Sequence, residues 1–173
     1  MRRGADYWIT KLQLNAHIEG GAYTRTYSSD LIIPQSHLST NFHGPRPVST
    51  AIYFLLKKDQ FSAMHRIASD ELWHFYYGDP LIVYELDVAG NLTKHLLGNN
   101  PENNEHFQCL VKAGSWFGAA VKDGSAYSLA GCTVAPGFDF ADFELGERNV
   151  LLKLYPQYAE IICQLTRTGN DPR

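Results

Sequence analysis

The sequence lacks the features that define several common protein classes. It contains only three cysteines, Cys109, Cys132 and Cys163, and no two of them form a CxxC pair, which argues against cysteine-ligated zinc and dithiol redox chemistry. Lysine and arginine (15) do not outnumber aspartate and glutamate (18), so no basic field favours nucleic acid. Apolar runs such as Ala51–Leu56 are far shorter than the roughly 20 residues that span a bilayer. We therefore expect neither a nucleic-acid partner nor a membrane.

Short motifs of nucleotide-binding and hydrolytic enzymes are also missing. No GxGxxG, GxxxxGK[ST] or GxSxG occurs, which argues against the usual dinucleotide and phosphate cradles and against a serine-hydrolase elbow. Met1-Arg2-Arg3 is followed by Gly4-Ala5-Asp6 rather than by an apolar stretch, so the start does not resemble a secretory signal. We expect a cytoplasmic protein whose cysteines are reduced.

Short β-forming segments dominate the rest of the chain. Apolar residues make up 45% and aromatic residues 13% of 173 residues, which is enough for one core. The expected strands cover residues 22–29, 49–56, 61–67, 71–77, 81–87, 92–97, 107–111, 116–121, 127–134 and 151–155. Strands at intervals of about 8 to 12 residues favour a sandwich or a closed barrel. We predict an all-β single domain over residues 1–173, with a core over about residues 6–166.

Helices are expected only near the two ends of the chain. The segment from Asp6 to Asn15 has apolar residues near helical spacing, and Asp6 is placed to cap its start. Residues 34–47 contain three prolines and are expected to form a loop or an interrupted strand. A short helix is expected within residues 156–167, and residues 168–173 are expected to be disordered.

The chemically informative stretch runs from His65 to Gly78. Five residues separate His65 from Glu71, and Gly78 follows after six more. This spacing resembles the first cupin motif, in which HxH is followed by Glu and then Gly. In that motif a barrel strand directs two imidazoles and a carboxylate inward to a divalent ion. Glu71 and His74 also have the ExxH spacing of a di-iron helix. That chemistry needs a second such motif in helical context, so we reject it.

Two of the four ligand positions of the cupin pattern carry apolar side chains. The second histidine position is Ile67. The second motif, similar to PxGxxH, falls on residues 112–117, where Lys112 replaces the proline and Phe117 replaces the histidine. We therefore predict no tightly bound metal. Weak binding of a divalent ion at His65 and Glu71 stays open.

Five motifs occur in an order that resembles the Cupin-5 family, a cupin group of unknown function. They are residues 19–23 (EGGAY), 49–56 (STAIYFLL), 70–76 (DELWHFY), 114–117 (GSWF) and 135–140 (APGFDF). The resemblance covers residues 6–166. It implies a cupin double-stranded β-helix, or jelly roll, with a short N-terminal helix, a small-molecule pocket and a homodimer of paired barrels. It implies no agreed substrate.

The retained histidine and carboxylate suggest a metal-independent isomerase or epimerase. In this hypothesis His65 is the general base, Glu71 fixes its tautomer, and a bulge brings His74 inward to assist. Cupins that act on deoxysugar nucleotides use such a histidine without a metal, so the resemblance favours a small polar substrate such as a sugar derivative. The residues expected to bind it are Arg25 as an anion clamp, Tyr23, Thr50, Tyr53, Trp73 and Trp116. Regular alternation allows only one of Thr50 and Tyr53 to face the pocket.

Two other functions stay open. A non-catalytic ligand-binding cupin would keep the pocket without a base, and a metal-dependent oxygenase or lyase would need a further ligand beside His65 and Glu71. Residues 136–145 combine acids and aromatics after a Pro-Gly turn. They form either a lid that brings Asp139 or Asp142 to the ligand, or a loop whose phenylalanines cover the barrel end or a partner.

Overall fold

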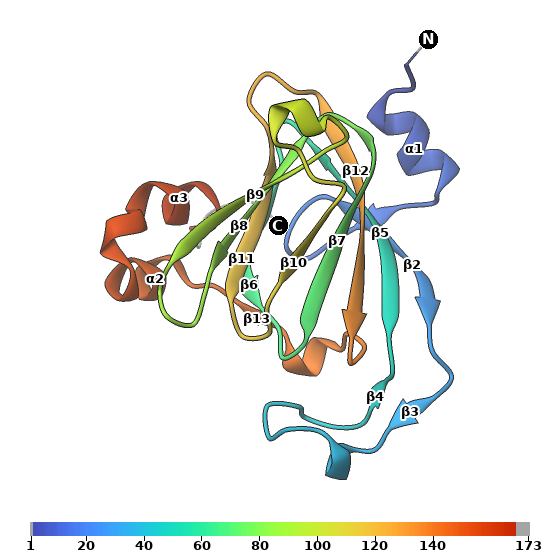
Figure 1. Ribbon diagram of the computed structural model, residues 1–173, viewed down its shortest axis with the longest axis vertical. Coiled ribbons are helices and arrows are strands. Elements are labelled where there is room, and N and C mark those ends of the chain that lie inside the picture. Colours follow the sequence, from blue (N-terminus) through green and yellow to red (C-terminus); the bar gives the residue numbers. More distant parts are fainter. Residues whose placement is uncertain (1, 169–173) are drawn as a thin grey trace.

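The computed structural model describes residues 2–168 and shows two antiparallel β-sheets packed face to face (Figure 1). The larger sheet has the order β1-β2-β5-β12-β7-β10, with bounds Asn15–Ala16, Ala22–Ser28, Thr50–Lys57, Tyr127–Ala135, Asp70–Gly78 and Gln108–Val111. The smaller sheet has the order β13-β6-β11-β8-β9, with bounds Glu144–Leu145, Phe61–Arg66, Trp116–Val121, Leu81–Leu86 and Leu92–Leu97. Most successive strands alternate between the two sheets, which confirms the predicted jelly roll.

Nine of the expected strands are present, with bounds that agree within one residue. Their β-forming residues alternate between the two faces of each sheet, and the inward set forms one apolar cluster between the sheets. In β7, for example, Glu71, Trp73 and Phe75 are buried, whereas His74 is only half-buried. Alternation therefore decides which side chains of each strand can reach the interior.

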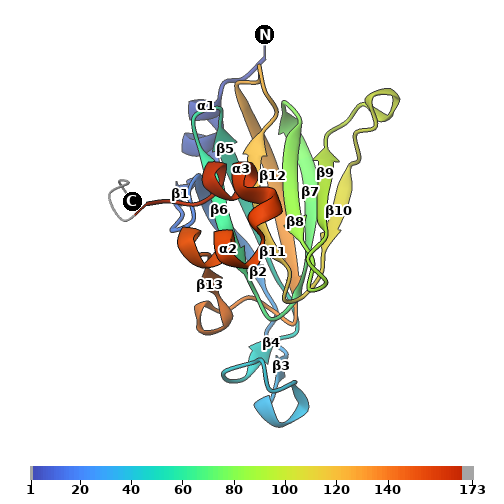
Figure 2. The same ribbon diagram turned by 90° about the vertical axis from the view of Figure 1, so that its left-hand side faces the viewer.

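The strand expected at residues 151–155 is wrong, because these residues lie in and just beyond α2 (Arg148–Leu154). A short apolar run does not distinguish a strand from a buried helix segment. Leu151 is fully buried and packs with Ile162 and Leu165 against Met64 and Trp116 on the outer face of the smaller sheet. The expected C-terminal helix is α3 (Ala159–Gln164), preceded by η4 (Pro156–Tyr158). Figure 2 shows α2 and α3 lying over this sheet.

The N-terminal helix is shorter than expected. It is α1 (Ala5–Lys11), and it ends early because Gln13 adopts a left-handed conformation and Asn15 already begins β1. Asp6 does not cap this helix; Gly4 is the N-cap, and Asp6 lies in the first turn. The helix packs on the outer face of the larger sheet, opposite α2 and α3 (Figure 1). Of the expected disordered tail, residues 169–173 lie outside the described residues.

Residues 34–47 form an interrupted excursion beyond one end of the sheets (Figure 1). The small strands β3 (Ile32–Ile33) and β4 (Arg46–Pro47) pair with each other, and η1 (Gln35–His37) lies between them. A further turn, η2 (Pro101–Asn103), connects β9 to β10. None of the helices among residues 2–168 is long and apolar enough to cross a membrane.

Candidate functional site

A small cavity lies between the two sheets, at the end nearest the excursion. Its lining comes from both sheets, from the loop between β1 and β2 and from the loop after β12: His17, Glu19, Tyr23, Arg25, Thr50, Ile52, His65, Glu71, Cys132, Val134, Phe138 and Phe140. Its free volume is about 40 Å³. Glu19, His65 and Glu71 are buried, whereas Arg25 and Phe140 are exposed. The cavity therefore has a polar inner end and opens toward solvent beside Arg25 and Phe140.

His65 is held by a carboxylate that the sequence analysis did not assign. Its Nδ1 lies 3.0 Å from Oε2 of Glu19 and 2.7 Å from the carbonyl oxygen of Ala63. Both partners accept hydrogen bonds, so Nδ1 carries a proton, and no partner for Nε2 lies among residues 2–168. Burial opposes the charged imidazolium, but the Glu19 carboxylate and the Ala63 carbonyl outweigh it and raise the pKa of His65. His65 and Glu19 thus form a buried ion pair.

Glu19 is positioned by a tight loop before β2. Its carbonyl accepts a hydrogen bond of 2.8 Å from the amide of Ala63, two residues before His65 in β6. Gly20 follows with φ +118°, and a Cβ there would lie 2.1 Å from the carbonyl oxygen of Phe61. Only glycine allows the chain to approach β6 this closely. Residues 19–23 were noted as a motif, and these glycines were the signal that Glu19 is placed against a strand.

Glu71 faces the same cavity but is not the partner that orients His65. Burial is the largest influence on this carboxyl, and it raises the pKa of Glu71 to about 7. The positive charge of His65 opposes that rise, and the negative charge of Glu19 adds to it. The neighbouring thiol of Cys132 lowers this pKa slightly. Near neutral pH, Glu71 is therefore able both to take up and to release a proton.

His17 completes the polar group and is neutral. Burial lowers its pKa more than the neighbouring Glu19 carboxylate raises it. The backbone amide of Glu19 donates to Nδ1 of His17 at 3.3 Å, so this nitrogen bears no proton. The ring lies edge-on to Tyr23, with 4.4 Å between centroids, and is stacked with Phe140 at 6.2 Å. No role for His17 was predicted from the sequence.

The structure brings together five of the expected site residues and leaves four elsewhere. His65, Glu71, Arg25, Tyr23 and Thr50 line the cavity. Tyr53 points to the opposite face of β5, where its ring meets Tyr76, so alternation places Thr50 inside. Trp73 is fully buried in the core beside Phe54, and Trp116 packs under α2 and α3 with Arg66 over its ring.

His74 lies on the outer face of β7, away from the cavity. Its Nε2 is 3.0 Å from the hydroxyl of Thr133, and its Nδ1 accepts a hydrogen bond of 2.9 Å from Gln108. The only irregularity between β7 and β12 lies beyond His74, between the pairs of Leu129 and Ala130, and it does not turn the imidazole inward. Strict alternation, rather than a bulge, decides where this side chain lies.

The donor set of the cavity does not fit the metal ion that the cupin pattern implies. Ile67 is buried in the apolar core. Phe117 is paired in register with His65, and its ring lies 4.1 Å from the imidazole. Nδ1 of His65 and the carboxylate of Glu19 are already bound to each other. Among residues 2–168, no group of three or more His, Cys, Asp or Glu side chains is arranged to hold a metal.

Residues 136–145, the cover segment, cross the end of the barrel from β12 to β13. Phe138 and Phe140 line the cavity, and β13 pairs with β6 beside His65. The amide of Gly137 donates to the carbonyl of Pro47 at 2.8 Å, and that of Phe138 donates to the Thr50 hydroxyl at 2.9 Å. The phenylalanines therefore cover the barrel end, which is the second of the two arrangements considered from the sequence.

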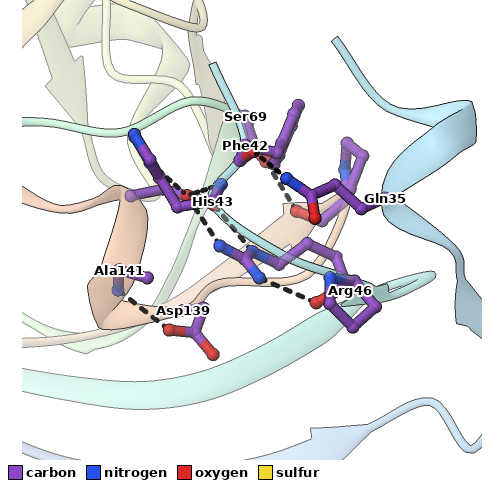
Figure 3. Close-up of polar contacts among 10 residues, drawn as sticks. Gln35, Phe42, His43, Arg46, Ser69, Asp139 and Ala141 are labelled. Atoms are coloured by element: carbon purple, nitrogen blue, oxygen red, sulfur yellow. Dashed lines mark hydrogen bonds and ion pairs between the residues drawn. The ribbon is translucent and has the colours of Figure 1, made fainter. Parts of the chain in front are cut away.

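A buried ion pair ties the cover segment to the excursion (Figure 3). Nε and Nη2 of Arg46 each lie 2.6 Å from a carboxylate oxygen of Asp142, and both side chains are almost fully buried. The amide of His43 also donates to Asp142, at 2.9 Å. Asp139 accepts a hydrogen bond from the amide of Ala141 within the cover segment (Figure 3). Neither acid lines the cavity.

Comparison with known proteins agrees with this architecture. The chain is similar to a protein of Shewanella oneidensis with a known crystal structure, at 36% identity, 96% coverage of this chain and 99% of that chain, and a TM-score of 0.85. A hypothetical protein from Leishmania major matches at 33% identity over 96% of this chain and all (100%) of that chain, with a TM-score of 0.87. A cupin 2 domain-containing protein from Halorhodospira halophila is 10% identical over 90% and 89% of the two chains, and its TM-score of 0.55 shows the fold alone.

A search of curated proteins finds no match. The sequence profile described as Cupin superfamily (DUF985) matches residues 6–146, which include Glu19, His65, Glu71 and the whole cover segment. With the fold and two relatives above 30% identity in agreement, the chain belongs to this Cupin-5 family.

Proposed function

We propose that this protein is a metal-independent isomerase or epimerase that moves a proton on a small polar substrate. One observation carries the proposal: a carboxyl that titrates near neutral pH and a histidine in a fixed ion pair face the same small cavity. General acid–base catalysis is most effective when the pKa of the group lies near the working pH. Glu71 meets that condition.

The proposed reaction begins at a carbon next to a carbonyl group. The ionised carboxylate of Glu71 removes the proton from that carbon, and the electron pair of the C–H bond moves toward the carbonyl oxygen. Nε2–H of the His65 imidazolium donates a hydrogen bond to that oxygen and stabilises the charge that develops there. Return of the proton to the other face, or to the neighbouring carbon, completes an epimerisation or an isomerisation. No electrons are gained or lost.

The roles in this mechanism differ from those inferred from the sequence. Glu19, rather than Glu71, orients His65 through Nδ1. This leaves the Glu71 carboxyl available as the base, and the raised pKa of His65 suits a hydrogen-bond donor better than a base at neutral pH.

Exchange of substrate hydrogen with solvent tests the proposal directly. The protein is incubated in D₂O with 2-oxo acids, 2-hydroxy acids and 6-deoxysugar nucleotides, and loss of a C–H signal is followed by proton NMR. We expect catalysed exchange with at least one compound, and its loss in Glu71→Gln and His65→Ala. His106→Ala, which removes an exposed histidine outside the cavity, is the control and should keep full activity. Exchange that persists in Glu71→Gln would refute the assigned base, and saturable binding without exchange would identify a binding protein.

A further inference from the structure

Arg25 is a cation without a partner at the open end of the cavity. It lies in β2 on the same face as Tyr23, and both side chains line the cavity. In residues 2–168 no carboxylate or carbonyl accepts a hydrogen bond from its guanidinium. Within residues 2–168 the other exposed arginines are engaged: Arg2 with Asp79, Arg3 with the ring of Tyr7 and Arg66 with Glu144. A free guanidinium presents a planar fork that fits a carboxylate or a phosphate.

The charges inside the cavity leave Arg25 uncompensated. Glu19 and His65 are opposite in charge and bound to each other, and His17 is neutral. When Glu71 is protonated, Arg25 provides the net charge of the cavity, which is then positive. A ligand with a single negative charge then restores neutrality, with its anionic group beside the exposed Arg25.

The size of the cavity limits what such an anion can be. The free volume inside the cavity is small, about 40 Å³. A molecule of a few heavy atoms fits this space, whereas a nucleotide does not. The inner end, with Glu71 and His65, is apolar on its flanks because Ile52, Val134 and Phe138 complete the lining.

We propose that the cavity binds a short-chain monocarboxylate, with the carboxylate on Arg25 and the rest of the molecule directed toward Glu71 and His65. The proposal deepens the proposed function by naming its substrate class, and it rests on that function only for what happens after binding. It replaces the sugar derivative expected from the sequence with a smaller ligand.

Binding of such an anion should be linked to proton uptake. The titratable and charged groups around Glu71 are His65 from β6, Glu19 from the loop after β1, Cys132 from β12, Cys109 from β10, and Arg25 and His17 at the cavity wall. The pKa of Glu71 lies at about 7. A negative ligand in the cavity favours the protonated carboxyl, so affinity should fall as the pH rises above about 7.

Titration calorimetry with lactate, glycolate, acetate and pyruvate tests the charge requirement. Lactamide, the neutral analogue of lactate, is the control ligand. Arg25→Gln should weaken lactate binding roughly ten-fold or more, because a charge-assisted hydrogen bond is lost, and should leave lactamide binding unchanged. Arg3→Gln removes the same charge from the surface beside Tyr7 and should leave lactate binding unchanged. The proposal is overturned if none of the four acids binds saturably, if lactamide binds as tightly as lactate, or if Arg25→Gln binds lactate like the wild type.

Calorimetry in two buffers of different ionisation enthalpy then measures the linked proton. Near pH 7 the wild type should take up a fraction of one proton per lactate bound, and Glu71→Gln should take up none. Binding without proton uptake would place the anion away from Glu71 and overturn the proposed orientation. These outcomes separate the two proposals. Anion binding without solvent exchange would support the monocarboxylate as ligand and refute the isomerase. Solvent exchange that is unaffected by Arg25→Gln would support the isomerase and refute Arg25 as the site of the carboxylate.

Discussion

The raised pKa of Glu71 predicts a specific dependence of stability on pH. The carboxyl titrates at about 7 in the folded protein and near its ordinary value of 4.5 in the unfolded chain. Between these values the folded state holds a proton that the unfolded state has released. The free energy of unfolding should therefore be highest at low pH and fall as the pH rises from about 4.5 to 7. Above that range the whole penalty of a buried, ionised carboxylate is present.

The magnitude follows from the same interval. At about 1.4 kcal/mol for each pKa unit, the difference between 4.5 and about 7 amounts to about 3 kcal/mol. Glu71→Gln removes the titration and keeps the shape of the side chain. Relative to the wild type, this variant should gain up to about 3 kcal/mol of unfolding free energy between about pH 4.5 and pH 8. Contributions from groups that titrate alike in both proteins cancel in the difference.

Urea unfolding followed by tryptophan fluorescence measures this difference, because Trp73 and Trp116 are buried in the folded protein. Glu71→Leu is the matched control. It removes the same titration but packs differently, so its difference from Glu71→Gln should be the same at every pH. A wild type that differs from both variants by a constant amount over this range would show that Glu71 does not titrate near neutrality. The proposed base would then be ruled out.

Two further predictions concern the elements that position the cavity. Asp142→Asn removes the charge that compensates buried Arg46 and should lower the unfolding free energy by about 3–5 kcal/mol in the same urea assay. The control is Glu144→Gln at the exposed pair with Arg66, which should lower it by less than about 1 kcal/mol. Equal effects would show that Asp142 does not hold the cover segment. Gly20→Ala should cost more than Gly124→Ala in thermal unfolding, because both glycines have positive φ but only the first Cβ meets backbone, at 2.1 Å. A smaller loss for Gly20→Ala would contradict the close approach of this loop to β6.

Local pattern was sufficient to predict most of the fold. Period-two alternation located the strands, and it also correctly predicted that only one of Thr50 and Tyr53 lines the cavity. The failures arose where local pattern was ambiguous. Leu151 belongs to a short apolar run that is compatible with a strand or with a helix. Only its packing against the outer face of the smaller sheet identifies it as helical.

The site was harder to predict because its central contact is not local. Glu19 and His65 are far apart in the sequence, and nothing in the spacing of either residue indicates that they meet. The pair Gly20-Gly21 was the available signal, since both glycines have positive φ and both lie against backbone carbonyls. That signal indicates close approach to another strand without saying which one. His65 was therefore paired with Glu71, the carboxylate that the spacing of the first cupin motif indicates.

The apolar residues at the former ligand positions have a chemical consequence of their own. Phe117 occupies the position where the cupin pattern has a histidine, and its ring lies against His65 rather than offering a second nitrogen. Ile67 likewise adds apolar surface to the core. Burial is the largest influence on the carboxyl of Glu71, so loss of polar neighbours favours its protonated form at neutral pH. Apolar residues at these two positions therefore suit the proposed acid–base role of Glu71, because a carboxyl buried among apolar side chains keeps its proton up to about pH 7.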